Sequence, residues 1–184
     1  NLIKPNVLIM KALRVIGIIV IGLAAIYFIG GRLLPKSYSF QRSILIKAAD
    51  SVVYMNVADM NNFHKWNPWL KMEPTAKVKI SGNSAEPGNL WEWEGEELGT
   101  GSMELVKVNP YTSLDYELKF RQPYENSASS NFSFEKKPDG INVTWSLSGE
   151  SKTLPDRWMG LGMGIMMNKP FTSGLESLKE LSEK

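Results

Sequence analysis

Few residues in this chain could carry acid–base or metal chemistry. It contains one histidine, His64, and no cysteine, so thiolate catalysis, disulfide bonds and cysteine-type zinc sites are excluded. A histidine-based metal site would need more ligands than this chain has. His64 stands beside Lys65 in a short polar segment, which is more typical of a solvated or capping side chain than of a general base.

Carboxylates form one cluster in the sequence: Glu92, Glu94, Glu96 and Glu97. A pair of them could act as acid and base or hold Ca²⁺. However, Glu92 and Glu94 alternate with Trp91 and Trp93, which predicts that these two glutamates face solvent from a strand. No Ser-His-Asp spacing, phosphate loop or dinucleotide fingerprint is present. We therefore predict no catalytic residue, no metal ion and no cofactor.

Charge is balanced overall but unevenly distributed. The chain has 21 Lys and Arg against 19 Asp and Glu, without the concentrated basic face of a nucleic-acid-binding protein, so nucleic acid is not an expected partner. The first 32 residues carry four basic side chains and no acidic one: Lys4, Lys11, Arg14 and Arg32.

Between Arg14 and Arg32 runs a stretch of 17 residues without a charge. With Leu33 and Leu34 it reaches about 30 Å as a helix, the thickness of a bilayer core. We therefore predict a cytoplasmic segment over 1–14, a transmembrane helix over 15–34 and a domain over 36–184. A cleaved signal peptide is the alternative, although no small-x-small cleavage site follows the apolar run.

The membrane and its orientation follow from the flanking charges. Three cations precede the span, Lys4, Lys11 and Arg14, against Arg32 and Lys36 after it. This bias favours a single-pass protein of the bacterial inner membrane with a periplasmic C-terminal domain. Gly17, Ala24 and Gly31 recur at seven-residue spacing, which could admit another transmembrane subunit, although ordinary lipid exposure is the simpler interpretation.

The remaining residues predict one α+β domain. Residues 38–47 resemble a strand, and 52–57 and 59–66 resemble short helices. The period then changes to two in about six segments, near 78–80 and over 90–94, 102–108, 114–120, 127–135 and 141–148. From Pro155 the helical period returns, with an apolar stripe through Phe171, Leu175, Leu178 and Leu181. These elements predict a curved antiparallel sheet whose apolar face is covered by the C-terminal helix.

A pocket is expected between that helix and the sheet. The inward side chains predicted to form the core or line a cavity of several hundred Å³ are Trp91, Trp93, Leu114, Tyr116, Leu118, Phe120, Phe132, Phe134 and Trp145. From the helix, Met159 and Met163 are expected to contribute. Trp66 and Trp69 flank Pro68, and packing beneath the sheet is the favoured role for both tryptophans.

The start of the C-terminal helix has an unusual composition. Residues 159–167 read MGLGMGIMM, with no charge from there to Lys169 and with Pro170 following. Glycine and proline weaken helices, and methionine suits surfaces that repack. We predict a kink or break near Pro170 and a movable or membrane-touching gate over 159–168. Alternatively, the glycines only allow close packing of the helix on the sheet.

Several short motifs carry a resemblance to a known family. They are Phe63-His64-Lys65-Trp66-Asn67-Pro68-Trp69, Gly88, Trp91-Glu92-Trp93, Gly99-x-Gly101-Ser102-Met103 and Val143-Thr144-Trp145-Ser146-Leu147-Ser148-Gly149. With the element order, they resemble the polyketide cyclase/dehydrase branch of the START-like (SRPBCC) superfamily over residues 36–183. The junction Leu34-Pro35-Lys36 is similar to that of members with an N-terminal transmembrane anchor. The resemblance implies a helix-grip fold that encloses a hydrophobic cavity.

Three functions are consistent with the sequence. The favoured one is a membrane-anchored, non-catalytic domain that binds a hydrophobic small molecule or lipid. An accessory subunit of a larger membrane complex is the second, and a cyclase-like enzyme is the third.

Overall fold

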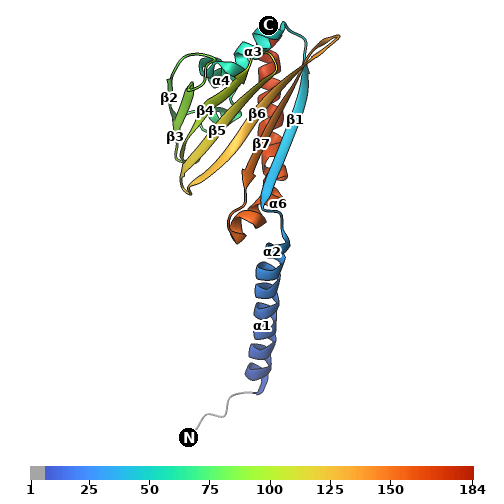
Figure 1. Ribbon diagram of the computed structural model, residues 1–184. Coiled ribbons are helices and arrows are strands. Elements are labelled where there is room, and N and C mark those ends of the chain that lie inside the picture. The colour runs from blue at the N-terminus through green and yellow to red at the C-terminus, as the bar shows by residue number, and fades with distance from the viewer. Residues whose placement is uncertain (1–6) are drawn as a thin grey trace.

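The computed structural model describes residues 7–184, with side chains from Ile9 onward. The first six residues of the expected cytoplasmic segment lie outside the described residues. Figure 1 shows two parts, a long helix at the N-terminal end and a sheet-and-helix domain at one end of it.

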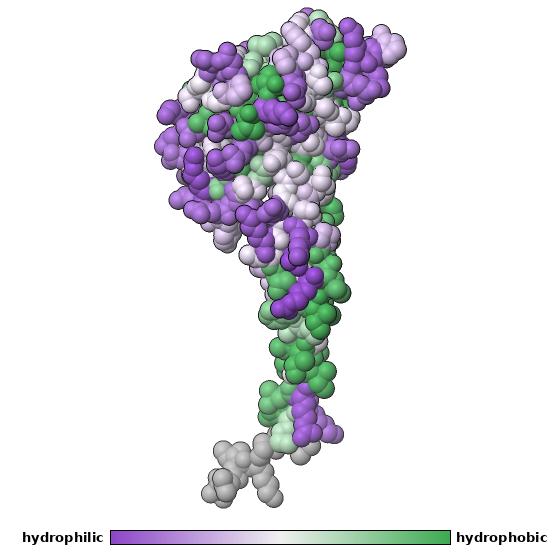
Figure 2. Space-filling model, in the orientation of Figure 1, coloured by the Kyte–Doolittle hydropathy of each residue, from purple (hydrophilic) through white to green (hydrophobic). Residues whose placement is uncertain are grey.

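The N-terminal helix is continuous to Leu33. It consists of α1 (Val7–Ala25), a π-helical turn η1 (Ile26–Gly30) and α2 (Gly31–Leu33). Leu34 is extended and Pro35 follows, so the helix ends where proline predicts. The segment Ile9–Leu33 is long and apolar enough to cross a membrane by length and composition. Figure 2 shows it as a hydrophobic column below a domain whose visible surface is mostly hydrophilic.

Seven strands form one antiparallel sheet in the order β1-β7-β6-β5-β4-β3-β2. The strands are β1 (Ser37–Ile46), β2 (Lys77–Ser81), β3 (Leu90–Glu94), β4 (Thr100–Asn109), β5 (Ser113–Gln122), β6 (Asn126–Lys137) and β7 (Gly140–Glu150). All seven predicted strands are confirmed. The first was predicted from its β-branched and aromatic composition, and alternation indicated the others because one face is buried and the other solvated.

Three short helices connect β1 to β2: α3 (Asp50–Ala58), α4 (Met60–Trp66) and α5 (Pro68–Met72). The first two match the prediction, whereas α5 was not expected. Asn67 and Pro68 are typical of a helix end, but Asn67 also caps a new helix, since its Oδ1 accepts the N–H of Trp69 at 2.9 Å. Proline at the first helical position is compatible with this start.

The C-terminal helix α6 (Leu154–Ser182) begins with a capping box formed by Thr153 and Asp156. Of the predicted kink or break near Pro170, the break is wrong, because the helix continues through this residue. A proline removes a single backbone donor, and the residues after it are firmly packed: Phe171, Leu175 and Leu178 are each at most 2% exposed.

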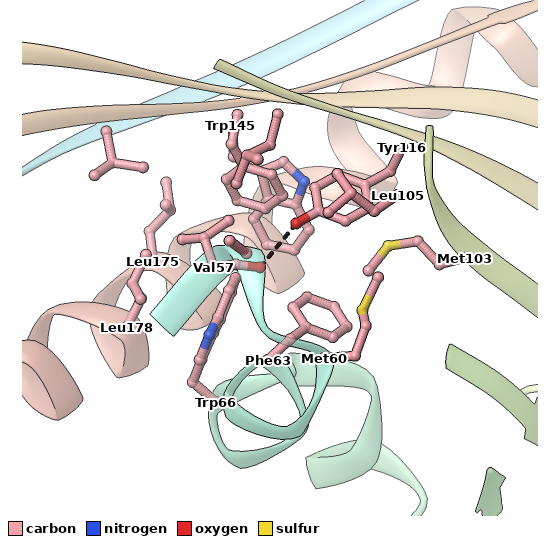
Figure 3. Packing of buried hydrophobic residues seen from close by; sticks show 14 of the residues in the cluster. Val57, Met60, Phe63, Trp66, Met103, Leu105, Tyr116, Trp145, Leu175 and Leu178 are labelled. Atoms are coloured by element: carbon pink, nitrogen blue, oxygen red, sulfur yellow. Dashed lines mark hydrogen bonds between the residues drawn. The ribbon is translucent and has the colours of Figure 1, made fainter. Parts of the chain in front are cut away.

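The core lies between the inner face of the sheet and helices α3, α4 and α6. Figure 3 shows Trp66 and Phe63 of α4 on one side, Tyr116 and Trp145 of the sheet on another, and Leu175 and Leu178 of α6. Trp66 packs edge-to-face on Trp145, with ring centroids 5.6 Å apart. The favoured packing role of Trp66 is thus confirmed, since it is 1% exposed.

Candidate functional site

Strand β5 carries the stripe that was expected to face α6 across a cavity. The first two residues of this stripe face helices other than α6. Leu114 and Tyr116 are at most 1% exposed, and the Tyr116 hydroxyl donates to the Val57 carbonyl at 2.8 Å (Figure 3). Burial, above all, raises the pKa of Tyr116, which stays neutral. The expectation that this part of the stripe faces α6 is therefore wrong, because α3 and α4 cover this part of the sheet.

The width of the sheet explains why α6 alone cannot cover its inner face. Seven strands make a sheet about 29 Å wide, whereas one helix covers about 10 Å. Helix α6 packs mainly along β1 at one edge of the sheet. A Cβ built at Gly160 would stand 3.2 Å from Ser151 Oγ, which is a tight contact, whereas one at Gly164 would stand 3.6 Å from Phe40, an ordinary packing distance.

Aromatic rings fill the centre between α6 and the sheet. Trp145 stacks on Phe171 with centroids 4.0 Å apart and on Phe132 at 5.0 Å. The Trp145 indole N–H donates to Ser130 Oγ at 2.9 Å. Gly174 leaves no room for a side chain, because a Cβ there would stand 2.9 Å from the Trp145 ring. Phe132 and Trp145 are therefore core residues packed by their neighbours.

Two adjoining cavities lie at the end of the domain far from the N-terminal helix. Their volumes are about 170 and 260 Å³, and both are lined by Asp50, Lys136 and Ile141. Phe134 alone among the predicted lining residues borders one of them. The Lys136–Asp50 ion pair at this entrance is exposed, which suits water better than a buried apolar ligand.

The opposite half of the inner face is apolar, with Met103 and Ala128 buried and Tyr38 and Leu118 only half-buried. One row of facing residues crosses five strands: Tyr38, Gly149, Ala128, Leu118 and Met103. The side chain of Tyr38 leans over Gly149, and burial, followed by the charge of Asp156, raises its pKa.

A second row lies closer to the strand ends and contains Trp93, Gly101 and Phe120. Trp93 leans over Gly101, which has no space for a Cβ. Phe120 is half-buried, with its ring 5.8 Å from that of Trp93. The two rows together form a continuous apolar strip, which we call the proximal strip.

Helix α6 carries a stripe of methionines in its first half. Met159, Met163 and Met166 recur at i, i+4 and i+7, so they share one face. Asn168, on nearly the opposite face, bonds Arg42 of the edge strand β1. The methionine face is therefore turned away from that edge of the sheet. Met163 is 9% exposed, whereas Met159 and Met166 are 46% and 56% exposed.

The structure thus separates the predicted lining residues into groups. Leu118, Phe120 and Trp93 lie toward the end of the sheet near the N-terminal helix, and Met159 and Met163 lie in the first half of α6. Leu114, Tyr116, Phe132 and Trp145 form the core, and Trp91 packs with Phe63 and Trp93. Phe134 lies at the far end. Whether any of them contacts a ligand stays a prediction.

Polar groups inside the domain are scarce. Among the described residues, the buried indole nitrogen of Trp91 and the amide nitrogen of Asn67 have no hydrogen-bond acceptor. Such donors can bind an oxygen of a ligand or of water. Sequence reasoning missed both, because an indole or amide without a partner has no sequence signal.

Side chains first considered for chemistry lie outside the interior. His64 is exposed. Glu94 is exposed, and Glu92 pairs with Lys79 and Arg121 on the outer face of the sheet. Within residues 7–184, no group of three His, Cys, Asp or Glu side chains gathers into a possible metal site.

Solved structures with the same fold are numerous, and three illustrate the range. Protein CV1439 from Chromobacterium violaceum matches with a TM-score of 0.59 and 14% identity, over 79% of this chain and 97% of that one. The Aha1 dimer from Colwellia psychrerythraea matches with a TM-score of 0.56 and 19% identity, over 79% and 96%. Ara h 8.0201 matches with a TM-score of 0.55 and 12% identity, over 78% and 99%.

At these identities the three structures show the fold alone, which is the expected helix grip. No curated protein sequence matches the chain. A family model described as polyketide cyclase/dehydrase and lipid transport matches residues 37–183, the entire domain after the N-terminal helix. The resemblance seen in the sequence motifs is thereby confirmed at the level of the family, and the chain belongs to the polyketide cyclase/dehydrase and lipid transport family.

Proposed function

We propose that this protein is a membrane-anchored domain that binds a hydrophobic, lipid-like ligand without transforming it. The ligand would lie between the proximal strip and the methionine face of α6. The family is one of hydrophobic-ligand domains, and the proposal assigns a location and a ligand class within it.

One observation carries the proposal. At the end near the N-terminal helix, half-buried Leu118 and Phe120 stand on the sheet while Met159 and Met166 are about half exposed on the helix. In the centre of the inner face, by contrast, Phe132 and Trp145 are sealed by stacked rings. Unsealed apolar surface with flexible methionines favours ligands of variable apolar shape.

Anchoring is supported by the N-terminal helix. Large apolar side chains cover it and are exposed, among them Ile18 and Ile21 at 70% each. Exposed apolar surface of this extent is typical of a helix surrounded by lipid. We propose that Ile9–Leu33 spans the bilayer and that the domain lies on the extracytoplasmic side, as the charge bias favours.

A photoreactive lipid tests the location. The full chain would be reconstituted in vesicles that contain a phospholipid with a diazirine in its acyl chain, illuminated, digested and mapped by mass spectrometry. We expect cross-links on the peptides that hold Met159 to Met166 and Leu118 to Phe120, besides those of the N-terminal helix. Cross-links confined to residues 9–33 would contradict the ligand site and leave the anchor standing.

An accessory role in a membrane complex is the second candidate. It is favoured by the outward face of α6, where Leu161 is 56% and Ile165 83% exposed. Neither side chain can contribute to the core or to the proximal strip, and a partner protein could cover both.

A further inference from the structure

The N-terminal helix and the start of α6 are joined by specific contacts. The Trp158 indole N–H donates to the Tyr27 carbonyl at 3.2 Å, and the two rings stack with centroids 6.3 Å apart. Arg157 Nη1 lies 3.4 Å from the Gly31 carbonyl oxygen and 3.3 Å from that of Arg32. These contacts connect residues about 125 positions apart in the chain.

Gly31 is required for this contact. A Cβ at Gly31 would lie 2.8 Å from Trp158 Nε1 and 3.0 Å from Leu154. By contrast, Gly17 and Gly22 have no atom within 4 Å of a built Cβ. The small residue at position 31 therefore packs within the chain, which removes it from the stripe first considered for another subunit. We call the group Tyr27, Gly31, Arg157 and Trp158 the junction.

Basic side chains surround the junction. Arg32, Lys36 and Lys152 are exposed next to it, and Arg157 belongs to it. The carboxylates close by are Glu150 and Asp156, and Asp156 is engaged as a cap by the N–H and hydroxyl of Thr153. The four cations Arg32, Lys36, Lys152 and Arg157 thus stand against two carboxylates around the junction, so the local electrostatic field attracts anions.

The position of these cations identifies the anion. They stand where an apolar helix of about 38 Å ends, beside a stacked Tyr and Trp. Aromatic residues and Arg or Lys at the end of a spanning helix are the signature of the bilayer interface, and clustered cations there attract anionic headgroups. A soluble anion would have no relation to the helix end.

We propose that the junction holds the domain against the headgroup layer of an anionic phospholipid leaflet, with Arg32, Lys36 and Lys152 binding lipid phosphates. The inference rests on the proposed anchor. It also deepens the proposed function, because the start of α6 and the proximal strip lie at this end of the domain. Both are thereby kept next to the lipid from which a ligand would come.

Single-cysteine labelling tests this contact, since the chain has no cysteine of its own. Three variants of the full chain would carry a small fluorophore: Ile19→Cys in the N-terminal helix, Pro155→Cys in the exposed first turn of α6, and Val52→Cys on α3 at the far end. Ile19 and Val52 are 55% and 44% exposed. Each is placed in nanodiscs of phosphatidylcholine and phosphatidylglycerol with nitroxide lipids as quenchers.

We expect a headgroup nitroxide to quench the Pro155→Cys probe several-fold more than the Val52→Cys probe, and a mid-chain nitroxide to quench the Ile19→Cys probe. Omitting phosphatidylglycerol, or combining Lys36→Gln with Lys152→Gln, should reduce the Pro155→Cys signal. Gly31→Leu should reduce it too, whereas the matched variant Gly22→Leu should not. If Gly31→Leu does not fold, Trp158→Phe removes only the indole donor and should give a smaller loss in the same direction.

The two proposals fail in different ways. Equal quenching of the Pro155→Cys and Val52→Cys probes, with Ile19→Cys still quenched, would overturn the junction's contact with lipid and preserve the anchor. Absence of quenching at Ile19→Cys would overturn the anchor, and the junction proposal with it.

Discussion

Glu73 is the carboxylate with the clearest role in this protein. It is 7% exposed and accepts three backbone N–H groups, from Glu96 at 2.6 Å, Leu98 at 2.9 Å and Glu97 at 3.1 Å. These hydrogen bonds, that from Leu98 foremost, hold the pKa of Glu73 below its ordinary value, against the opposing effect of burial. Glu73 thereby ties the end of α5 to the turn between β3 and β4.

Glu73→Gln should destabilise the fold in a pH-dependent manner. A lowered folded-state pKa stabilises the protein fully above the ordinary glutamate pKa of about 4.3, and this stabilisation is lost as pH falls through the lowered value. We therefore expect a lower Tm for the variant at pH 7 and a gap that closes in acid. Thermal unfolding of both proteins across this range measures it.

Glu94→Gln is the matched control, because Glu94 is exposed and pairs only with Lys77 on the surface. Its Tm should stay near that of the parent at every pH. A constant Tm gap between Glu73→Gln and the parent from neutral to acid pH would contradict the account.

The aromatic centre permits a second prediction at this scale. Trp145→Ala removes a ring that stacks on both Phe132 and Phe171, and it leaves Ser130 without its donor. We expect a loss of about 3–5 kcal/mol in the free energy of unfolding, measured by urea denaturation. Tyr124→Ala, at a side chain 82% exposed, should cost little, and equal losses in the two variants would refute the packing described.

The sequence could predict which faces of residues are buried but could not identify this carboxylate. Alternation of Trp91 and Trp93 with Glu92 and Glu94 correctly predicted the solvent side of β3. The partners of Glu73 are backbone N–H groups more than 20 residues away, and backbone donors have no side-chain signature. The carboxylates that stand out in the sequence are instead the cluster of Glu92, Glu94, Glu96 and Glu97.

At the scale of elements, strands were predictable because each has its own period of two. Helix α5 was not, since its start signal, Asn67-Pro68, is also a stop signal for α4. The helices that cover the apolar face of the sheet were predicted incompletely for a related reason. Periodicity shows that a face is buried, whereas which helix buries it depends on the width of the sheet and on long-range contacts such as Tyr116 to Val57.

Helix α6 should behave as two halves in hydrogen exchange. Between residues 159 and 168 only Met163 is buried, and the segment contains three glycines, whereas Phe171, Gly174, Leu175 and Leu178 are buried in the second half. Local stability follows such packing. We expect amides of 159–168 to exchange much faster than those of 172–182 in detergent.

The same amides should slow when the full chain is placed in phospholipid nanodiscs. The second half serves as an internal reference, because its protection should not change between detergent and nanodisc. Equal protection of both halves, unaffected by lipid, would remove the basis for a movable cover.

At the scale of the whole molecule, the N-terminal helix and the unsealed apolar surface lie at the same end of the domain. The two small cavities around Asp50 and Lys136 lie at the other end. This polarity is a consequence of topology, because β1 begins, β7 ends and α6 begins beside Lys36. It brings the apolar N-terminal helix and the proposed ligand site to the same end of the domain without a long linker.

The sequence could predict the apolar N-terminal helix and the family, since each depends on composition or local motifs. It could not predict the junction. Gly31 and Trp158 are brought together only by the fold. The sequence therefore suggested that Gly31 could pack against another transmembrane subunit, whereas it packs against Trp158 of the same chain.

Lipid content of the purified full chain tests the central claim most directly. Lipids would be extracted and quantified by mass spectrometry for the parent, for Ala128→Phe and for Ser129→Phe. Ala128 lies on the proximal strip between Leu118 and Gly149, and Ser129 is its exposed neighbour on the opposite face. We predict that the parent and Ser129→Phe retain the same hydrophobic molecule in near-stoichiometric amount and that Ala128→Phe loses it while remaining folded. Identical lipid content in all three proteins would contradict a ligand site on the proximal strip.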